Sequence, residues 1–191
     1  ARFLAAVSHD LRTPLTRIRL RVAPLESDNL RQKLEADIDE MAAMLDATLQ
    51  YLRGQAQAEP WQSLDIQSLL ESMVEDAQEQ GEAVTLAGHL APIMAQPSAL
   101  RRCIGNLLEN AIRYGGAATI SVQEQADAVV IQIRDAGPGI PENRMASVFE
   151  PFVRLEESRN RHTGGVGMGL AIARELAHRH GGQITLANAP T

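Results

Sequence analysis

Apolar residues recur at steps of three and four through the first fifty residues, and this spacing constrains the fold more than any other feature of the sequence. The first run is Leu4, Val7, Leu11, Leu15, Ile18, Val22 and Leu25. The second run is Leu30, Leu34, Ile38, Met41, Leu45, Thr48 and Leu52. Residues at this spacing share one face of an α-helix. The sequence therefore predicts two amphipathic helices, joined by a turn at Ser27, Asp28 and Asn29.

The two helices are expected to form an antiparallel hairpin, because only a short turn joins them. A single hairpin buries its two apolar stripes poorly. Two copies packed as a four-helix bundle would remove both stripes from water, so we predict a homodimer formed through residues 1–53. A simple coiled-coil hairpin is the alternative interpretation of the same pattern.

Helical periodicity stops at residues 54–60, which have no apolar period and end in proline. We therefore predict a linker at 54–61 and a second domain at 62–191. Ser98 is expected to cap a helix in that domain. The predicted helices are 66–77, 98–114 and 169–180, and the predicted strands are 83–86, 91–95, 119–122, 129–134 and 183–186. The strands at 119–122 and 129–134 are expected to form a hairpin. This mixture of elements indicates an α+β two-layer sandwich.

Composition and charge exclude several functions. Aromatic residues make up 3% of the chain and the formal net charge is -6. The chain thus lacks the stacking side chains and positive charge that nucleic-acid binding uses. No stretch reaches the roughly twenty apolar residues that cross a bilayer. Helical periodicity is already present at Leu4, so we expect missing segments upstream of Ala1, and any membrane attachment through them.

The cysteine and most of the histidines offer no sign of a metal site. Cys103 is the single cysteine, which excludes an internal disulfide and suits a reducing compartment. We interpret it as a buried helix residue. The histidines at 89, 162, 178 and 180 lack the spacing of metal ligands, so no structural metal is predicted.

His9 lies opposite the apolar stripe of the first helix, because Val7 and Leu11 are each two residues, or roughly 200°, away. A neutral imidazole with a free nitrogen is a nucleophile near neutral pH, and Asp10 can hold its opposite N–H and select the reactive tautomer. Pro14 cannot donate to the Asp10 carbonyl, so the helix is expected to bend beside His9. An isolated exposed histidine is usually inert, and the neighbouring residues decide its interpretation.

Residues 8–15, SHDLRTPL, resemble the phosphoacceptor box of sensor histidine kinases, and His9 matches its phosphorylated histidine. The resemblance implies a protein histidine kinase that uses ATP to phosphorylate His9 and passes the phosphoryl group to an aspartate of a response regulator receiver domain. It also implies the cytoplasmic portion of an inner-membrane sensor. Thr13 matches a position that serves dephosphorylation of the regulator; alternatively, its hydroxyl only bonds to a helix carbonyl beside Pro14.

A second group of polar residues shares one face of the helix predicted at 98–114. Asn106, Asn110 and Arg113 follow one another at i, i+4 and i+7. Amide oxygens can bind Mg²⁺, and an arginine can contact phosphates. This segment resembles the family's N box, which implies Asn110 as the magnesium ligand, Asn106 as its support and Tyr114 as a contact to the nucleoside.

Two glycine-rich segments and one aromatic segment resemble the remaining boxes of the family's ATP-binding domain. The first glycine box has Asp135, Gly137, Gly139 and Ile140, and its aspartate is implied to bind the adenine amino group. The F box has Phe149 and Arg154, which are implied to anchor and flank a lid. The second glycine box opens a helix, whose N–H groups can hold phosphate. Its expected nucleotide contacts are Gly165, Val166, Gly167, Met168, Gly169 and Leu170.

The resemblance covers nearly the whole chain and implies the histidine kinase-type ATP-binding fold, although the sequence stops at Thr191 without the usual final strand. Arg159 and Arg161 flank the lid and could contact phosphates.

One alternative function is that of an ATPase of the gyrase type, but such relatives have a water-activating glutamate where this chain has Asn106. The other rival is a dimer module without catalysis, which intact His9, Asp10 and Asn110 oppose.

Overall fold

The structure is a computed structural model that describes the chain apart from short segments. The described residues are 13–25, 27–56, 59–154 and 167–189. Within them, residues 13–56 form one compact unit, and residues 59–154 with 169–189 form a second. None of the helices in these described ranges is long and apolar enough to span a membrane.

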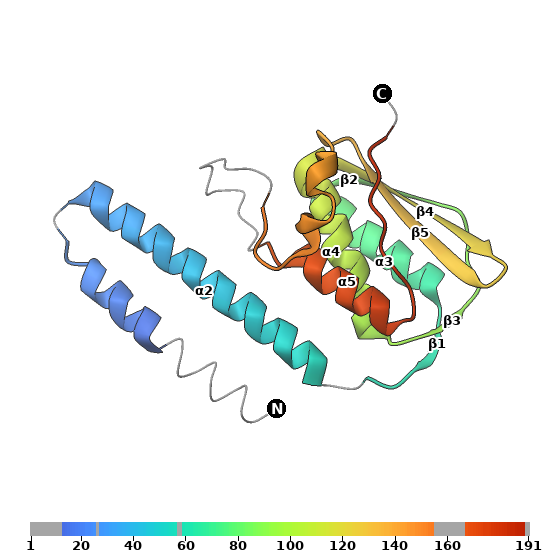
Figure 1. The fold of residues 1–191 in the computed structure, drawn as a ribbon, viewed down its shortest axis with the longest axis horizontal. Coiled ribbons are helices and arrows are strands. Elements are labelled where there is room, and N and C mark those ends of the chain that lie inside the picture. The colour runs from blue at the N-terminus through green and yellow to red at the C-terminus, as the bar shows by residue number, and fades with distance from the viewer. Residues whose placement is uncertain (1–12, 26, 57–58, 155–166, 190–191) are drawn as a thin grey trace. The chain divides into compact units, whose positions relative to one another are not determined.

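The first unit is an antiparallel helical hairpin, as predicted (Figure 1). Residues 13–22 are helical, and α2 covers Asp28–Ala56. An ion pair between Arg19 and Asp39 joins the two helices. The apolar stripes meet in the hairpin, where the buried side chains include Val22, Ile38 and Leu49. The predicted position Thr48 instead bonds to the Met44 carbonyl (Oγ1 to O, 2.8 Å).

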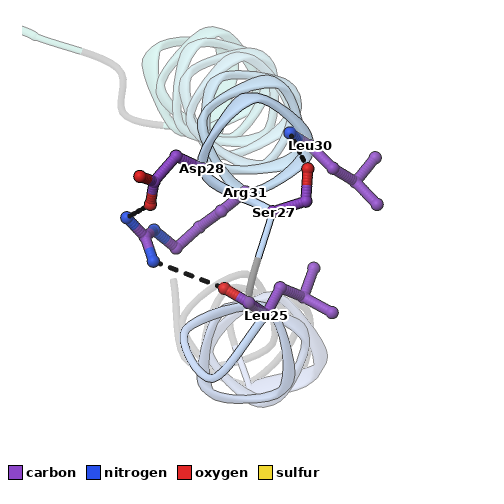
Figure 2. A network of polar contacts seen from close by, with 5 residues as sticks. All are labelled: Leu25, Ser27, Asp28, Leu30 and Arg31. Carbon is purple, nitrogen blue, oxygen red and sulfur yellow. Dashed lines mark hydrogen bonds and ion pairs between the residues drawn. The ribbon is translucent and has the colours of Figure 1, made fainter.

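The turn of the hairpin lies earlier than predicted. The first helix ends at Val22, and α2 already begins at Asp28. Pro24 explains the early end, because proline disfavours helical geometry in the residue before it and cannot donate a backbone hydrogen bond. Ser27 caps α2: its Oγ accepts the N–H of Leu30 at 3.4 Å (Figure 2).

The Arg31 side chain connects the turn to α2. Its guanidinium donates to the Leu25 carbonyl (Nη1 to O, 3.4 Å) and pairs with Asp28, as Figure 2 shows. At its other end, α2 continues to Ala56 rather than stopping at Arg53. The helix therefore includes Gly54, which was predicted to lie in the linker.

The second unit contains two small sheets. Strand β1, Gln62–Leu64, pairs antiparallel with β3, Ile93–Ala95. The larger sheet has the order β2-β4-β5. Strand β2 (Ala83–Ala87) is parallel to β4 (Ala117–Gln125), which forms an antiparallel hairpin with β5 (Ala128–Asp135). The hairpin confirms the pairing predicted for the strands at 119–122 and 129–134.

Helices cover one face of the larger sheet, which makes a two-layer α+β arrangement (Figure 1). Helix α3 (Ile66–Glu79) packs on β2, α4 (Pro97–Gly115) packs on β4 and β5, and α5 (Gly169–Arg179) packs on α4. The largest fully buried side chains of this core are Ile66, Leu70, Leu90, Ile120 and Val84. The predicted fold class, a helical hairpin followed by an α+β sandwich, is confirmed.

One predicted strand, at 183–186, was wrong, and one short strand was not predicted. Residues 183–189 contain no strand, although Ile184 and Leu186 are half-buried with exposed neighbours, as alternation predicts. A strand also needs a backbone partner, whereas this segment is attached to the described part of the chain through the Asn188 side chain. Strand β1 was missed because its three residues are too few for alternation to show.

Helix α4 is capped by a residue far away in the sequence. Pro97 occupies its first turn, and Gln96 at the cap position makes no side-chain cap bond. Instead, the Glu59 carboxylate accepts the N–H groups of Ser98 (2.9 Å) and Ala99 (3.1 Å). The prediction that Ser98 is the cap was therefore wrong: Ser98 lies inside the helix as a donor.

The same contact lowers the pKa of Glu59. Partial burial acts to raise its pKa, but the hydrogen bonds from Ser98 and Ala99 outweigh burial and hold the pKa below its ordinary value. Nearby, His180 Nε2 accepts the Gln96 N–H at 3.2 Å, and its ring contacts Trp61 edge-on with centroids 5.2 Å apart. The residues that enter the second unit are thus attached to both α4 and α5.

We predict that Glu59→Ala lowers the free energy of unfolding by about 1 kcal/mol at pH 7, because two donors of α4 lose their acceptor. The loss should shrink as the pH falls through the lowered pKa of Glu59, since the wild-type carboxylate is then protonated and its stabilisation disappears. Urea denaturation at several pH values measures both effects. Glu79→Ala, exposed on α3, is the control and should change stability little; equal effects of both variants would contradict the cap.

Candidate functional site

Helix α4 carries the expected N box beside its buried face. The buried residues of α4 are Cys103, Ile104, Leu108 and Ala111. Asn106 and Asn110 follow the buried Cys103 by three and seven residues, so they lie at the edge of this buried face, and both are half-buried. The helix ends as predicted, because Gly116 adopts the left-handed conformation (φ 69°) and its N–H bonds to the Ile112 carbonyl. Packing of the apolar face therefore determines where the two amides point.

Asn106 lies beside the start of α5. Its Nδ2 donates to the Arg102 carbonyl at 2.9 Å, which fixes the orientation of the amide. A Cβ added to Gly169 would lie 3.5 Å from Asn106 Oδ1. The fold thus brings the expected N box next to the described end of the second glycine box.

In the last turn of α4, Arg113 was expected to contact phosphates but is paired with a residue of its own helix, whereas Tyr114 is exposed. The Arg113 guanidinium forms an ion pair with Glu109 on the same helix (Nη2 to Oε1, 2.6 Å). Both side chains are partly exposed, so this pair is weak and can open for another anion. Tyr114 is 44% exposed at the end of the helix, where an aromatic face is accessible to a flat ligand.

The loop after β5 packs against this end of α4. Asp135 Oδ1 accepts the Gly137 N–H at 2.8 Å, which closes a tight turn. A Cβ on Gly115 would lie 2.6 Å from the Asp135 Cβ and 2.8 Å from the Ala136 nitrogen, so only glycine fits there. Gly139 has φ 77°, a conformation that side chains disfavour.

The two phenylalanines of the expected F box differ in burial. Phe149 is buried, and the guanidinium of Arg174 from α5 lies 5.1 Å from its ring centroid. Phe152 is 48% exposed and has φ 67°, an uncommon value for a side chain of this size. Phe149 is thus attached to α5, whereas Phe152 and Arg154 are exposed.

Several predicted residues lie outside the described part of the chain: His9, Asp10, Arg159, Arg161, Gly165 and Val166. Thr13 is the first described residue of its helix and is exposed. Gly167 has φ 74°, and Met168 is buried.

Sequence reasoning missed Asn188, whose side chain bonds to Ile140 of the first glycine box. No periodicity or motif marks Asn188, because its partner is 48 residues away.

The described residues include no group of three or more His, Cys, Asp and Glu side chains that could hold a metal ion. Cys103 is buried, as predicted, and donates to the Ala173 carbonyl at 3.3 Å. Burial raises the pKa of its thiol to about 11, which makes the thiolate rare at neutral pH. Cys103 therefore packs α4 against α5 and is unsuited to nucleophilic chemistry.

Family comparison assigns both parts of the chain. Residues 95–191 match the family of histidine kinase-, DNA gyrase B- and HSP90-like ATPases. Residues 1–57 match the His Kinase A (phospho-acceptor) domain. The chain belongs to the sensor histidine kinases. The resemblance noted in the sequence is thereby confirmed.

Curated sensor histidine kinases match almost the whole chain. The sensor histidine kinase GtrS of Pseudomonas aeruginosa is 41% identical over 184 residues, which cover 96% of this chain and 38% of GtrS. The sensor histidine kinase CpxA of Escherichia coli is 30% identical over 202 residues, which cover 99% of this chain and 44% of CpxA. This kinase chain therefore spans less than half the length of either relative.

Solved structures show the same fold. The crystal structure of full-length ShkA in complex with AMPPNP has a TM-score of 0.63 and 27% identity, and the match covers 94% of this chain and 41% of ShkA. The ATP-binding domain of PrrB from Mycobacterium tuberculosis has a TM-score of 0.56 and 30% identity, over 68% of this chain and 88% of that domain.

Two glycines of α4 provide a matched test of the contact between this helix and the Asp135 loop. We predict that Gly115→Ala lowers the free energy of unfolding by about 1–3 kcal/mol, because the new methyl group overlaps loop backbone. Gly105→Ala should keep or raise stability, since its Cβ would meet only Met73 Cε at 3.7 Å and alanine favours helix. Chemical denaturation of both variants measures the difference, and equal stability would contradict the close approach.

Proposed function

We propose that this chain is an ATP-dependent protein histidine kinase that phosphorylates His9 and passes the phosphoryl group to an aspartate of a response regulator receiver domain. The observation that supports the proposal most is the gathering of three boxes around α4. Asn106 lies beside Gly169, and the end of the helix at Gly115 lies beside Asp135. One helix thus connects segments that, in a nucleotide site, would hold phosphates at one end and the base at the other.

The donor set fits magnesium-bound ATP. Mg²⁺ prefers oxygen donors and usually takes one or two from the protein and the rest from phosphates and water. Asn110 would supply an amide oxygen, with Asn106 as its support, while the free carboxylate oxygen of Asp135 would accept from the adenine amino group. The bound metal would neutralise phosphate charge. Tyr114, Gly137, Gly139, Ile140, Phe149, Arg154 and the segment 165–170 complete the proposed nucleotide contacts.

In the proposed reaction, a nitrogen of His9 attacks the γ-phosphorus of ATP. A nitrogen–phosphorus bond forms, the bond from the γ-phosphorus to the bridging oxygen breaks, and ADP leaves. Asp10 would hold the opposite N–H of the ring and stabilise its positive charge. The phosphoryl group would then pass to a receiver aspartate, with the imidazole as leaving group. Asn106 replaces the glutamate that would activate water, which favours kinase over ATPase chemistry.

The hairpin supports a homodimer formed by residues 1–53, with the catalytic domain at 62–191 after a linker. Four large apolar side chains on the hairpin are 42–70% exposed: Ile18, Leu20, Leu30 and Met41. A second hairpin would cover such a surface. We place this chain in the cytoplasmic portion of an inner-membrane sensor, since the relatives that it matches are sensor proteins of greater length.

His9→Gln should abolish autophosphorylation while ATP binding stays nearly unchanged, because the nucleophile and the nucleotide contacts lie on different domains. Asn110→Ala should instead impair magnesium-dependent nucleotide use, because the proposed ligand is lost. Both variants are incubated with ATP labelled at the γ-phosphate, and acid-labile, base-stable label on the protein is measured. His89→Gln, exposed in the second unit, is the control and should label normally. Label retained on His9→Gln would rule out His9 as the acceptor.

We also propose that Thr13 serves dephosphorylation of the regulator. Thr13 is exposed and follows His9 by four residues in the sequence, one turn of the predicted helix, from where its hydroxyl can orient a water for in-line attack on a docked phosphoaspartate. Thr13→Ala should keep His9 phosphorylation and transfer but lose phosphatase activity. The decay of phosphorylated regulator is compared between wild type and variant in the presence of ADP. Equal decay rates would exclude this role and leave Thr13 a helix-bonding residue.

A further inference from the structure

The first glycine box is held at both ends by side-chain amide or carboxylate groups. At its beginning, Asp135 Oδ1 accepts the Gly137 N–H at 2.8 Å. At its end, Asn188 Oδ1 accepts the Ile140 N–H at 2.9 Å, and Asn188 Nδ2 donates to the Ile140 carbonyl at 2.9 Å. One side-chain amide thus satisfies both backbone groups of one residue, which only a single orientation of that amide allows.

Asn188 also lies directly on the loop backbone. A Cβ on Gly139 would be 2.8 Å from Asn188 Oδ1 and 3.2 Å from its Cγ. The φ of 77° favours glycine at 139, and a side chain there would displace the Asn188 amide. The segment that carries Asn188 forms no strand, so its attachment to the loop depends on the side chain rather than on a backbone ladder.

The position of these bonds indicates a role in the loop rather than in the core. Both bonds are exposed to solvent, where an intramolecular hydrogen bond adds little to global stability because water can replace it. Two such bonds on one residue nevertheless restrict the backbone of a short loop. A loop that is ordered before its ligand arrives binds more tightly, because less conformational entropy is lost on binding.

We propose that Asn188 is a positioning residue for nucleotide binding, which acts by holding Gly139 and Ile140 in the conformation that the adenine end of the nucleotide needs. This inference rests on the proposed function, in which Asp135 and its loop contact the base. It assigns a role to a residue that lies outside all of the boxes. Because the loop is placed at the base end, Asn188 should affect ATP and ADP equally.

The decisive variants are Asn188→Ala and Asn188→Asp. Alanine removes both bonds, whereas aspartate keeps an acceptor for the Ile140 N–H but sets a carboxylate against the Ile140 carbonyl. We expect each to weaken ATP and ADP binding by about tenfold, the effect of losing one or two modest hydrogen bonds. Titration calorimetry of the full chain with magnesium measures the dissociation constants. Gln123→Ala, exposed on β4, is the control and should bind both nucleotides as wild type does.

Amide hydrogen exchange without nucleotide tests the hydrogen bonds themselves. Asn188→Ala should speed exchange of the Ile140 N–H by about tenfold and leave the core amides of β4 unchanged, since only the loop opens. Unchanged exchange at Ile140 would overturn the proposal. Faster exchange with unaltered nucleotide affinity would also overturn it, because the position of the loop would then not matter for binding. An ATP effect without an ADP effect would overturn the placement at the base end.

Asp135→Ala separates failure of this inference from failure of the proposed function. If wild type binds ATP and Asp135→Ala binds it poorly, the loop contacts the nucleotide, and normal binding by the Asn188 variants then rejects the role of Asn188 alone. If Asp135→Ala binds ATP as wild type does, the proposed base site is wrong, and the inference is rejected with it. Absence of ATP binding by wild type would reject the proposed function itself.

Discussion

Burial of one face of α4 is the constraint on which the candidate site depends. Cys103, Ile104, Leu108 and Ala111 are enclosed between the sheet and α5, and burying a single large aliphatic side chain contributes about 1.5–3 kcal/mol. The helix cannot rotate about its axis without exposing them. The positions of Asn106 and Asn110, one turn apart at the edge of the buried face, are therefore fixed as well.

Residues distant in sequence then hold both ends of this helix. Glu59 supplies the acceptors for the N–H groups of Ser98 and Ala99, and its attachment lies where the chain enters the second unit. At the other end, Gly115 allows the Asp135 loop to approach the helix backbone. A functional loop supported by a rigid helix keeps its geometry better than a loop supported by other loops. Helix α4 thus supports the proposed nucleotide contacts of the N box and of the Asp135 loop.

Regular elements were predictable wherever a local pattern was long enough. The spacing of apolar residues gave α3, α4 and α5 to within a few residues, and alternation gave the hairpin of β4 and β5. Predictions failed where a distant partner decides the outcome. Serine is a common capping residue, but the helix already begins at Pro97, and the Glu59 carboxylate accepts the N–H of Ser98. Ile184 and Leu186 alternate as in a strand, yet their segment forms no strand.

The sequence by itself determined the chemistry of this sensor histidine kinase: the residue types of the boxes, their order and their spacing along helices and loops. These are local properties, because helix periodicity and turn preference act over a few residues. Only the tertiary structure decided which distant groups meet, such as Asn106 with Gly169, Glu59 with α4, and Asn188 with Ile140. Such contacts depend on how buried faces pack, and packing is a property of the whole fold that no segment carries alone.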